Sequence, residues 1–470
     1  MILLIFDILI IAICIIIIRN FKLGYFLSLI IKIAIPSVVR FQLGGFSINH
    51  VDILMLALLI SFIIKKPYKR IKLPKKIKAF ILINVLSTLV LIIFSLGIVP
   101  YEYQLSSYFK GYFFQTYMYI FFGYFAFQNI KNIESINKSI IIVSIVCGIY
   151  GIITYITKDN PYINILYNIY SGGDNIFSYF MEETRGGIEG RISGTMSHPL
   201  HWGQYWNIVI AYLILFYKRT NIYLLISICV IGVINIVLCG SRTSLITLVV
   251  TFIFFISSFG FKSLIKYSII SYVILVFTIG FIPQNNQSKG IITYLQSAIF
   301  FWDNSYSEKA NIQGSNTNMR LTQLNESIKY MKKNPIGGVG YNYQYYVQEK
   351  RINTKLMGFE SIVFKLLVEQ GIISLILFFY TYNLLRKHLI YKRSLKEKIL
   401  LNGYFASFLI SILFTGIQAN SWIFFICFSF IYLGLNKVIP KQRINTVVNN
   451  KTLIRQSTYE DRNSNISQSI

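Results

Sequence analysis

Two arginines stand where a permanent positive charge needs a ligand or a strong partner. Arg242 lies in the segment 240–244 (GSRTS) between two apolar runs, and Arg320 begins a helical pattern within the longest polar loop. A charged side chain beside the hydrocarbon of a membrane is costly and is usually functional or paired. The planar guanidinium matches phosphate oxygens and stays charged. If the two arginines face the same side of the membrane, they suit a diphosphate.

The small residues around Arg242 are the first feature that favours a ligand. Gly240, Ser241, Thr243 and Ser244 leave room for a headgroup to approach the guanidinium closely. An interfacial arginine can equally snorkel toward lipid headgroups without a specific ligand. The sequence leaves both interpretations open.

The segment 191–201 (RISGTMSHPLH) places Arg191, His198 and His201 just before an apolar run. We expect these donors to line a pocket for sugar or phosphate; the alternative is a polar loop entering a helix. The spacing of the two histidines would permit a metal site, but neither a cysteine nor a convincing carboxylate accompanies them. We therefore expect no metal and no cofactor.

Glu360 precedes the apolar run 361–385, and Glu369 lies inside it. Glu360 is either a favourable partner of the helix dipole or a general base for an attacking hydroxyl. For Glu369 we favour pairing, because an intramembrane carboxylate is paired or functional. The chain has no Asp-x-Asp motif for Mg²⁺, and arginines can stabilise a diphosphate leaving group in place of a metal.

The glycine-rich segment 334–341 (NPIGGVGY) ends at Tyr341. It has neither of the common nucleotide-loop spacings and is better interpreted as a tight turn after a helix. Aromatic residues of the same region can stack on sugar faces or anchor at the membrane interface. These aromatic residues are Trp302, Tyr341, Tyr343, Tyr345 and Tyr346.

The composition places these residues in a membrane protein. Of the 470 residues, 54% are hydrophobic and only 13% charged, whereas soluble domains carry about 25% charged residues. Apolar runs recur at lengths that cross a bilayer as helices. We predict an all-α polytopic transmembrane protein with 12 or 13 spans, and we interpret the first run as a retained helix rather than a signal peptide. The expected spans are 2–18, 21–36, 51–64, 79–99, 109–127, 139–157, 200–217, 221–239, 243–259, 266–283, 361–385, 399–414 and 419–436.

The net charge of +27 is explained better by topology than by nucleic-acid binding. The loop 65–78 holds eight cations and no acid, and the loop 386–398 holds six cations and one Glu. Short cationic loops beside apolar spans mark the cytoplasmic side. The five cysteines all lie in apolar runs, so they are expected to be core residues.

Alternation from the two cytoplasmic loops divides the chain into six parts. Two long loops fall on the outer side, and so do Arg242 and Arg320. In the second loop we predict a helix from Met319 to Lys333, capped by residues 316–318 and ended by Asn334-Pro335, with Leu321, Leu324, Ile328 and Met331 on one face. The parts are N-terminal helices 1–157, an outer loop 158–199, core helices 200–283, a long outer loop 284–360 containing helices, C-terminal helices 361–436, and a basic, disordered cytoplasmic tail 437–470.

The ordered set of motifs over about 190–375 resembles the bacterial O-antigen polymerase/ligase family. The resemblance rests on Arg191-x-x-Gly194-Thr195 with His198-Pro199, on Ser241-Arg242-Thr243, on Arg320 followed by Asn334-Pro335-x-Gly337-x-x-Gly340, and on Glu369-x-Gly371. It implies a membrane glycosyltransferase that uses glycans linked to undecaprenyl diphosphate. Arg242 and Arg320 match the family's functional arginines. The ligase branch carries a histidine nine residues before Glu-x-Gly, where this chain has Glu360.

That departure favours a polymerase of O-antigen or capsule repeat units. We expect Arg242, Arg320 and Glu360 to be catalytic and Arg191, His198, His201 and Tyr341 to bind substrate, with a nearby histidine as the alternative base. The expected partners are an undecaprenyl-diphosphate-linked oligosaccharide, membrane lipid and possibly a chain-length regulator, but no nucleic acid. The expected location is the bacterial inner membrane, with the site on the periplasmic side. The alternatives are an O-antigen ligase and, in another class, a lipid-linked oligosaccharide flippase.

Overall fold

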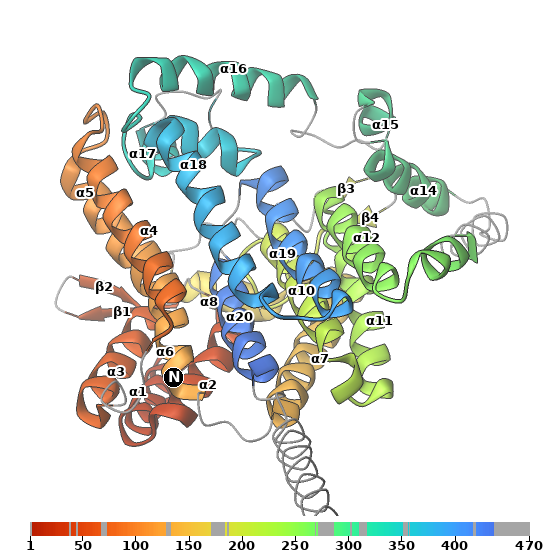
Figure 1. Cartoon of the computed structure of the whole chain (residues 1–470), viewed down its shortest axis with the longest axis horizontal. Helices are drawn as coiled ribbons and strands as arrows, with labels where there is room; N and C mark the ends of the chain where they lie inside the picture. Colours follow the sequence, from red (N-terminus) through yellow and green to blue (C-terminus); the bar gives the residue numbers. More distant parts are fainter. Residues whose placement is uncertain are drawn as a thin grey trace, which may run out of the picture.

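The computed structural model shows a bundle of helices crossed at one end by α16 and α17 (Figure 1). It describes residues 2–36, 39–43, 46–66, 73–127, 133–170, 184–185, 188–267, 269–270, 286–300, 303–309, 317–350, 356, 358–416 and 420–436. Most of the span expected at 266–283, Trp302 and the tail 437–470 lie outside these residues.

The helices follow the apolar runs of the sequence. In the N-terminal half they are α1 (Ile2–Arg19), α2 (Phe21–Ala34), α3 (His50–Lys65), α4 (Lys75–Ile93), α5 (Tyr101–Ser107), the π-helix η2 (Tyr108–Tyr117), α6 (Met118–Phe127), α7 (Ile133–Thr157) and α8 (Pro161–Tyr170). In the C-terminal half they are α10 (Pro199–Leu215), the 3₁₀ turn η3 (Tyr217–Arg219), α11 (Ile222–Leu238), α12 (Arg242–Ser257), α14 (Asn286–Ile299), α15 (Asn304–Lys309), α16 (Thr317–Lys333), α17 (Tyr343–Lys350), α18 (Ile362–Ile390), α19 (Leu395–Thr415) and α20 (Ser421–Asn436).

The chain is an all-α polytopic membrane protein, as its composition predicts. Within the described residues, α4, the stretch Ile136–Thr157 of α7, α18 and α19 are long and apolar enough to cross a membrane. The apolar helices α11, α12 and the stretch Ser421–Leu435 of α20 are shorter. Two small antiparallel hairpins, not predicted from the sequence, join the helices: β1 (Arg40–Leu43) with β2 (Phe46–Asn49), and β3 (Thr184–Arg185) with β4 (Ile188–Glu189).

Helix α10 lies at the centre of the bundle. Trp202, Tyr205 and Trp206 are fully buried on it, and it contacts α11, α12, α19 and α20. The close contact with α12 depends on Gly203, since a Cβ there would lie 2.3 Å from Oγ of Ser244. Packing at this density fixes the position of the helix start, which carries the histidines of segment 191–201.

One end of the bundle gathers basic side chains. Arg219 Nη1 donates to the carbonyl of Gly434 at 3.4 Å, and Arg393 Nη1 donates to that of Leu435 at 3.0 Å. Both bonds are made at the C-terminal end of α20, where cations are favoured by the helix dipole. The loops near 218–219 and 391–394 therefore share one end, as alternation requires. The assignment of this end to the cytoplasm stays a prediction.

Helix α16 lies where the sequence predicts it, and it ends before Asn334-Pro335. The residues it buries are nevertheless Gln323 and Ser327, while Leu321 is 51% exposed. The apolar face proposed from helical spacing is therefore not the most buried one. The reason is that Gln323 makes specific hydrogen bonds to the segment 358–360.

The break in α18 joins two motifs that are far apart in the sequence. Gly371 has φ +72°, and a Cβ there would lie 2.2 Å from the carbonyl oxygen of Pro335. The amides of Val339 and Gly340 donate to the carbonyls of Val368 and Glu369 at 2.9 and 3.1 Å. The glycine-rich segment is thus a turn, as predicted, and it packs directly on the broken helix.

Candidate active site

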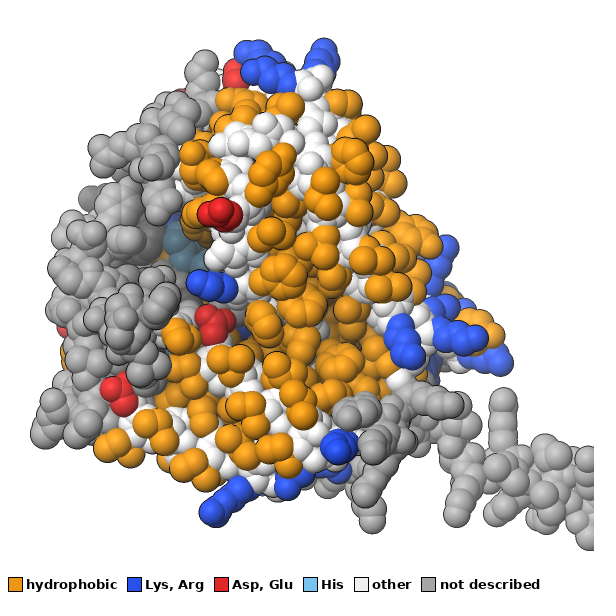
Figure 2. All heavy atoms as spheres, turned by 90° about the vertical axis from the view of Figure 1, so that its left-hand side faces the viewer, with side chains coloured by type: hydrophobic (Ala, Val, Ile, Leu, Met, Phe, Trp, Pro, Cys, Tyr) orange, Lys and Arg blue, Asp and Glu red, His pale blue; other side chains and the backbone are white. Residues whose placement is uncertain are grey.

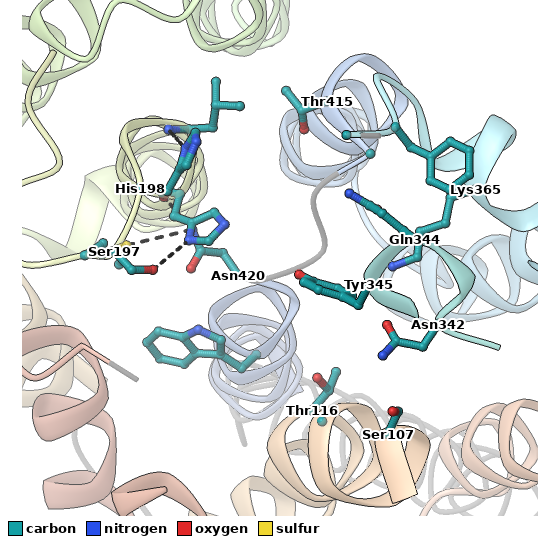
Figure 3. A pocket seen from close by; sticks show the side chains of 18 of the residues that line it. Ser107, Thr116, Ser197, His198, Asn342, Gln344, Tyr345, Lys365, Thr415 and Asn420 are labelled. Atoms are coloured by element: carbon teal, nitrogen blue, oxygen red, sulfur yellow. Dashed lines mark hydrogen bonds between the residues drawn. The ribbon is translucent and has the colours of Figure 1, made fainter. Parts of the chain in front are cut away.

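A cavity of about 830 Å³ lies where α10, α17, α18, α19 and α20 converge (Figure 3). It is at the opposite end of α20 from the basic cluster, because Asn420 and Trp422 at the start of that helix line it. Its polar and charged lining residues include Lys32, Ser107, Thr116, Thr195, Ser197, His198, His201, Asn342, Gln344, Glu360, Lys365, Thr415 and Asn420.

The two histidines form one wall with the start of α10. His198 is the N-cap of this helix, and its Nδ1 accepts a hydrogen bond from the amide of Leu200 at 3.0 Å. Because Nδ1 accepts, the proton of the neutral ring is on Nε2. The rings of His198 and His201 are 5.4 Å apart, and Nδ1 of His201 lies 3.4 Å from Oγ of Ser197. These rings supply the hydrogen-bonding groups expected at this rim.

Glu360 forms part of the other wall, and Arg320 stands beside it. Arg320 Nη2 lies 3.6 Å from Oε2 of Glu360, with side-chain exposures of 26% and 23%. Gln323 holds the backbone here, since its Oε1 accepts from the amide of Glu360 at 2.9 Å and its Nε2 donates to the carbonyl of Gly358 at 3.2 Å. Two of the predicted catalytic residues therefore meet beside the cavity, which Glu360 lines and Arg320 reaches through its contact with Glu360.

The tyrosines of the segment 341–346 divide between the cavity and a small core. Tyr341 and Tyr345 line the cavity. Tyr343 is only 2% exposed and its Oη lies 3.2 Å from that of Tyr330. Burial raises the pKa of Tyr343 above its ordinary value. The expectation that Tyr343 stacks on sugar is therefore corrected, because its ring packs in a satellite core that Tyr346 also touches.

Glu369 is paired, as expected for an intramembrane carboxylate, and its partner is the backbone at the start of helix α17. Its Oε1 accepts from the amide of Gln344 at 3.3 Å, and the side chain is 1% exposed. A carboxylate at the first turn of α17 is favoured by the helix dipole. Glu369 therefore positions the segment that carries Tyr341 and Gln344.

Arg191 is not among the residues that line the cavity, and its role in substrate binding stays a prediction. The side chain is 3% exposed, and Nε donates to the carbonyl of Cys239 at 3.0 Å. Its aliphatic part packs over Gly240, where a Cβ would lie 3.1 Å from Cγ of the arginine. The guanidinium supports the turn between α11 and α12, because the last carbonyls of a helix attract cations.

Arg242 is the first residue of α12 and is 9% exposed. Its small neighbours are packed rather than open: Ser241 caps the helix by accepting from the amide of Ser244 at 3.2 Å, and Ser244 packs on Gly203. Ser241 and Ser244 are packed against protein neighbours, so these two residues do not themselves open a space beside the guanidinium. Arg242 is not among the residues that line the cavity.

The two arginines nevertheless lie at the same end of the bundle. Gly403 of α19 packs on Phe254 of α12. Arg242 comes twelve residues before Phe254, and Thr415 comes twelve residues after Gly403. The start of α12 lies near the start of α10, because Ser244 packs on Gly203. Thr415 at the end of α19 lines the same cavity as His201 at the start of α10. Arg320 Nη2 donates to the carbonyl of Phe414 at 3.4 Å.

Sequence reasoning missed several residues of the cavity. Lys32 and Trp422 lie within apolar runs, and Lys365 and Asn420 lie at their ends. Lys32 carried a usable signal, because a lysine inside a membrane span is unusual. Gln323 carried none, since a glutamine on a polar helix is unremarkable until the helix is seen to pack on segment 358–360.

Comparison with known proteins agrees with this architecture. Residues 227–379 match the protein-family model described as O-antigen ligase. A search of curated proteins found no match. The matched segment runs from α11 to the middle of α18 and contains Arg242, Arg320 and Glu360. The family implies a glycosyltransferase-type activity at a membrane, with lipid-linked glycans as substrates. Over these residues the chain is similar to the O-antigen polymerase/ligase family of membrane proteins.

Proposed function

We propose that the chain is a polymerase of surface polysaccharide repeat units, and that the cavity is its active site. The donor is a growing glycan on undecaprenyl diphosphate, and the acceptor is one repeat unit on the same lipid. The acceptor hydroxyl oxygen forms a bond to the anomeric carbon of the donor. The bond between this carbon and the phosphate oxygen breaks, and the diphosphate lipid leaves with the bonding electrons.

The observation that carries the proposal is the contact of Arg320 with Glu360, the carboxylate that lines the cavity. One carboxylate and one guanidinium side by side supply the two groups that this reaction needs. Glu360 takes the proton of the attacking hydroxyl, with His201 as the alternative base. Arg320 neutralises the charge that develops on the departing diphosphate, which is where fixed charges have their largest effect.

Arg242 has a supporting role in this scheme, for which the structural argument is weaker than for Arg320. It is at the same end as the cavity, but its side chain is largely buried. We propose that it stabilises the diphosphate from the α12 side. Within this scheme Tyr341 and Tyr345 stack on the sugar rings, and His198 donates from Nε2.

Access from the membrane supports a lipid-linked substrate. Figure 2 shows apolar side chains spread over the face to which α4 and α5 contribute, with a hollow beside them in which histidine surface is visible. On α4, Leu86, Val90 and Ile93 are 51%, 47% and 69% exposed. An apolar face beside a polar cavity suits a ligand whose tail stays in lipid while its headgroup enters the protein. We propose that this occurs at the bacterial inner membrane, on the periplasmic side.

The test is extension of a defined lipid-linked repeat unit by the purified full chain. We expect chains of several repeat units to form, and wild-type protein that forms none would overturn the proposal. Movement of labelled lipid between leaflets without new glycosidic bonds would identify a flippase instead.

The ligase is the second candidate, because the matching family model bears that description. The two are distinguished by the glycans of a deletion strain. Loss of long chains, with single units still attached to the final acceptor, indicates a polymerase. Loss of all attached glycan indicates a ligase.

A further inference from the structure

A lysine from the N-terminal helices enters the cavity. Lys32 is in the last turn of α2 and lines the cavity. The adjacent residue Ile33 fixes the position of Lys32 relative to the segment 191–201, because the carbonyl of Ile33 accepts a hydrogen bond from Oγ1 of Thr195 at 2.8 Å. Thr195 lines the cavity too. The ammonium group is therefore beside the segment that leads into His198.

Aromatic faces hold this ammonium group. Nζ of Lys32 lies 4.5 Å from the ring centre of Tyr119 and 4.8 Å from that of Trp422. Both contacts are within the range in which a ring attracts a cation. Trp422 itself lines the cavity, so the held cation is at the cavity surface.

The cavity consequently has basic groups on two walls. Lys365 is on α18, on the wall with Glu360 and its partner Arg320. Figure 3 shows Lys365 on one side of the cavity and Ser197, His198 and Asn420 on the other, with ribbon of the N-terminal helices on that second side. Lys32 belongs to this second wall through Thr195 and Trp422. A single diphosphate bound at Arg320 leaves the second wall unused.

The number of diphosphates differs between the two candidate reactions. A polymerase holds two lipid diphosphates at once, one on the donor and one on the acceptor. A ligase that transfers glycan to another acceptor needs one. We propose that Lys32, with Ser197, His198 and Asn420 beside it, binds the diphosphate of the acceptor lipid, while Arg320 binds that of the donor. This inference rests on the proposed function and specifies its substrate arrangement.

The first test measures binding without catalysis. Purified full chain in lipid nanodiscs is titrated calorimetrically with farnesyl diphosphate, a short analogue of the lipid. We expect two sites for wild-type protein and one site for Lys32→Met, because loss of a charged contact weakens binding about tenfold or more. Lys32→Arg retains the charge and is expected to keep both sites.

Two controls separate ligand binding from a structural role. Lys22→Met changes an exposed lysine on the same helix and should keep two sites. The melting temperature of each variant is measured in parallel. One site in wild-type protein, or two unchanged sites in Lys32→Met, would overturn the inference, and so would loss of both sites.

The second test uses the extension reaction with donor and acceptor varied separately. Lys32→Met should raise KM for the acceptor about tenfold or more, with KM for the donor within about twofold. A larger effect on the donor would refute the assignment of the two walls. Wild-type protein that binds two farnesyl diphosphates but does not extend the lipid-linked repeat unit would refute the polymerase proposal. The second anion-binding site would then still stand.

Discussion

Nη2 of Arg320 lies 3.6 Å from Oε2 of Glu360 and also donates to the carbonyl of Phe414 at 3.4 Å. The contact joins the first turn of α16 to the segment before α18 and to the end of α19. Two residues that are 40 positions apart therefore act as one unit at the cavity wall. Because they share a contact, changes to them should not be independent.

Glu360→Gln and Arg320→Ala should each lower the extension rate about 100-fold or more. The first change removes the base, and the second removes the positive charge that stabilises the departing diphosphate. The double variant should be little worse than either single one, because groups that act together are not additive. Rates for the three variants in purified protein check this. Multiplication of the two single effects would show that the residues act separately.

A matched control is available on the same helix. Lys329 is an exposed residue of α16 that pairs with Glu326 at 2.7 Å. Lys329→Ala should leave extension within about twofold, because exposed ion pairs contribute little. Arg320→Lys should fail like Arg320→Ala if two-point contact with phosphate matters. A fully active Arg320→Lys would mean that a single charge suffices.

Arg191→Ala should destabilise the protein. The change removes the bond to the carbonyl of Cys239 and the packing on Gly240, at a cost of about 1–3 kcal/mol. The measurement is the melting temperature in detergent, together with KM for the lipid-linked substrate. A normal melting temperature with a raised KM would support the role in substrate binding that the sequence indicates.

Gly371→Ala should be far more disruptive than Gly111→Ala. At Gly371 the backbone has φ +72° and the new Cβ would meet the carbonyl of Pro335, whereas at Gly111, on η2, it would meet no atom within 4 Å. Backbone angles in this region, which is essentially restricted to glycine, cost another residue about 1–3 kcal/mol. Melting temperatures of the two variants check this, and equal values would show that the break in α18 is free to relax.

A chelator should leave extension unchanged. Among the described residues that line the cavity, Glu360 is the one carboxylate, and Arg320 stands beside it. Divalent cations that bind phosphate prefer several oxygen ligands, whereas this lining offers lysines and histidines. Extension is measured with and without EDTA, followed by added Mg²⁺. Activity that EDTA abolishes and Mg²⁺ restores would place a metal in the reaction.

The sequence by itself determined the class of protein and most of its helices. Apolar runs long enough to cross a bilayer have few alternatives to helix, because backbone groups in lipid must bond within the segment. Asn334-Pro335 ended α16 where it was expected to end. The motifs around Arg242, Arg320 and Glu369 were sufficient for the family, which the match over 227–379 supports.

The tertiary structure alone decided which residues meet. His198, Glu360 and Tyr341 come to one cavity from three separate helix ends, and Lys32 joins them from α2. Arg191 and Arg242 are arginines like Arg320, but packing buries them. Helical periodicity also misjudged the buried face of α16, because Gln323 bonds the segment before α18. Such contacts join residues distant in sequence, and local patterns contain no information about them.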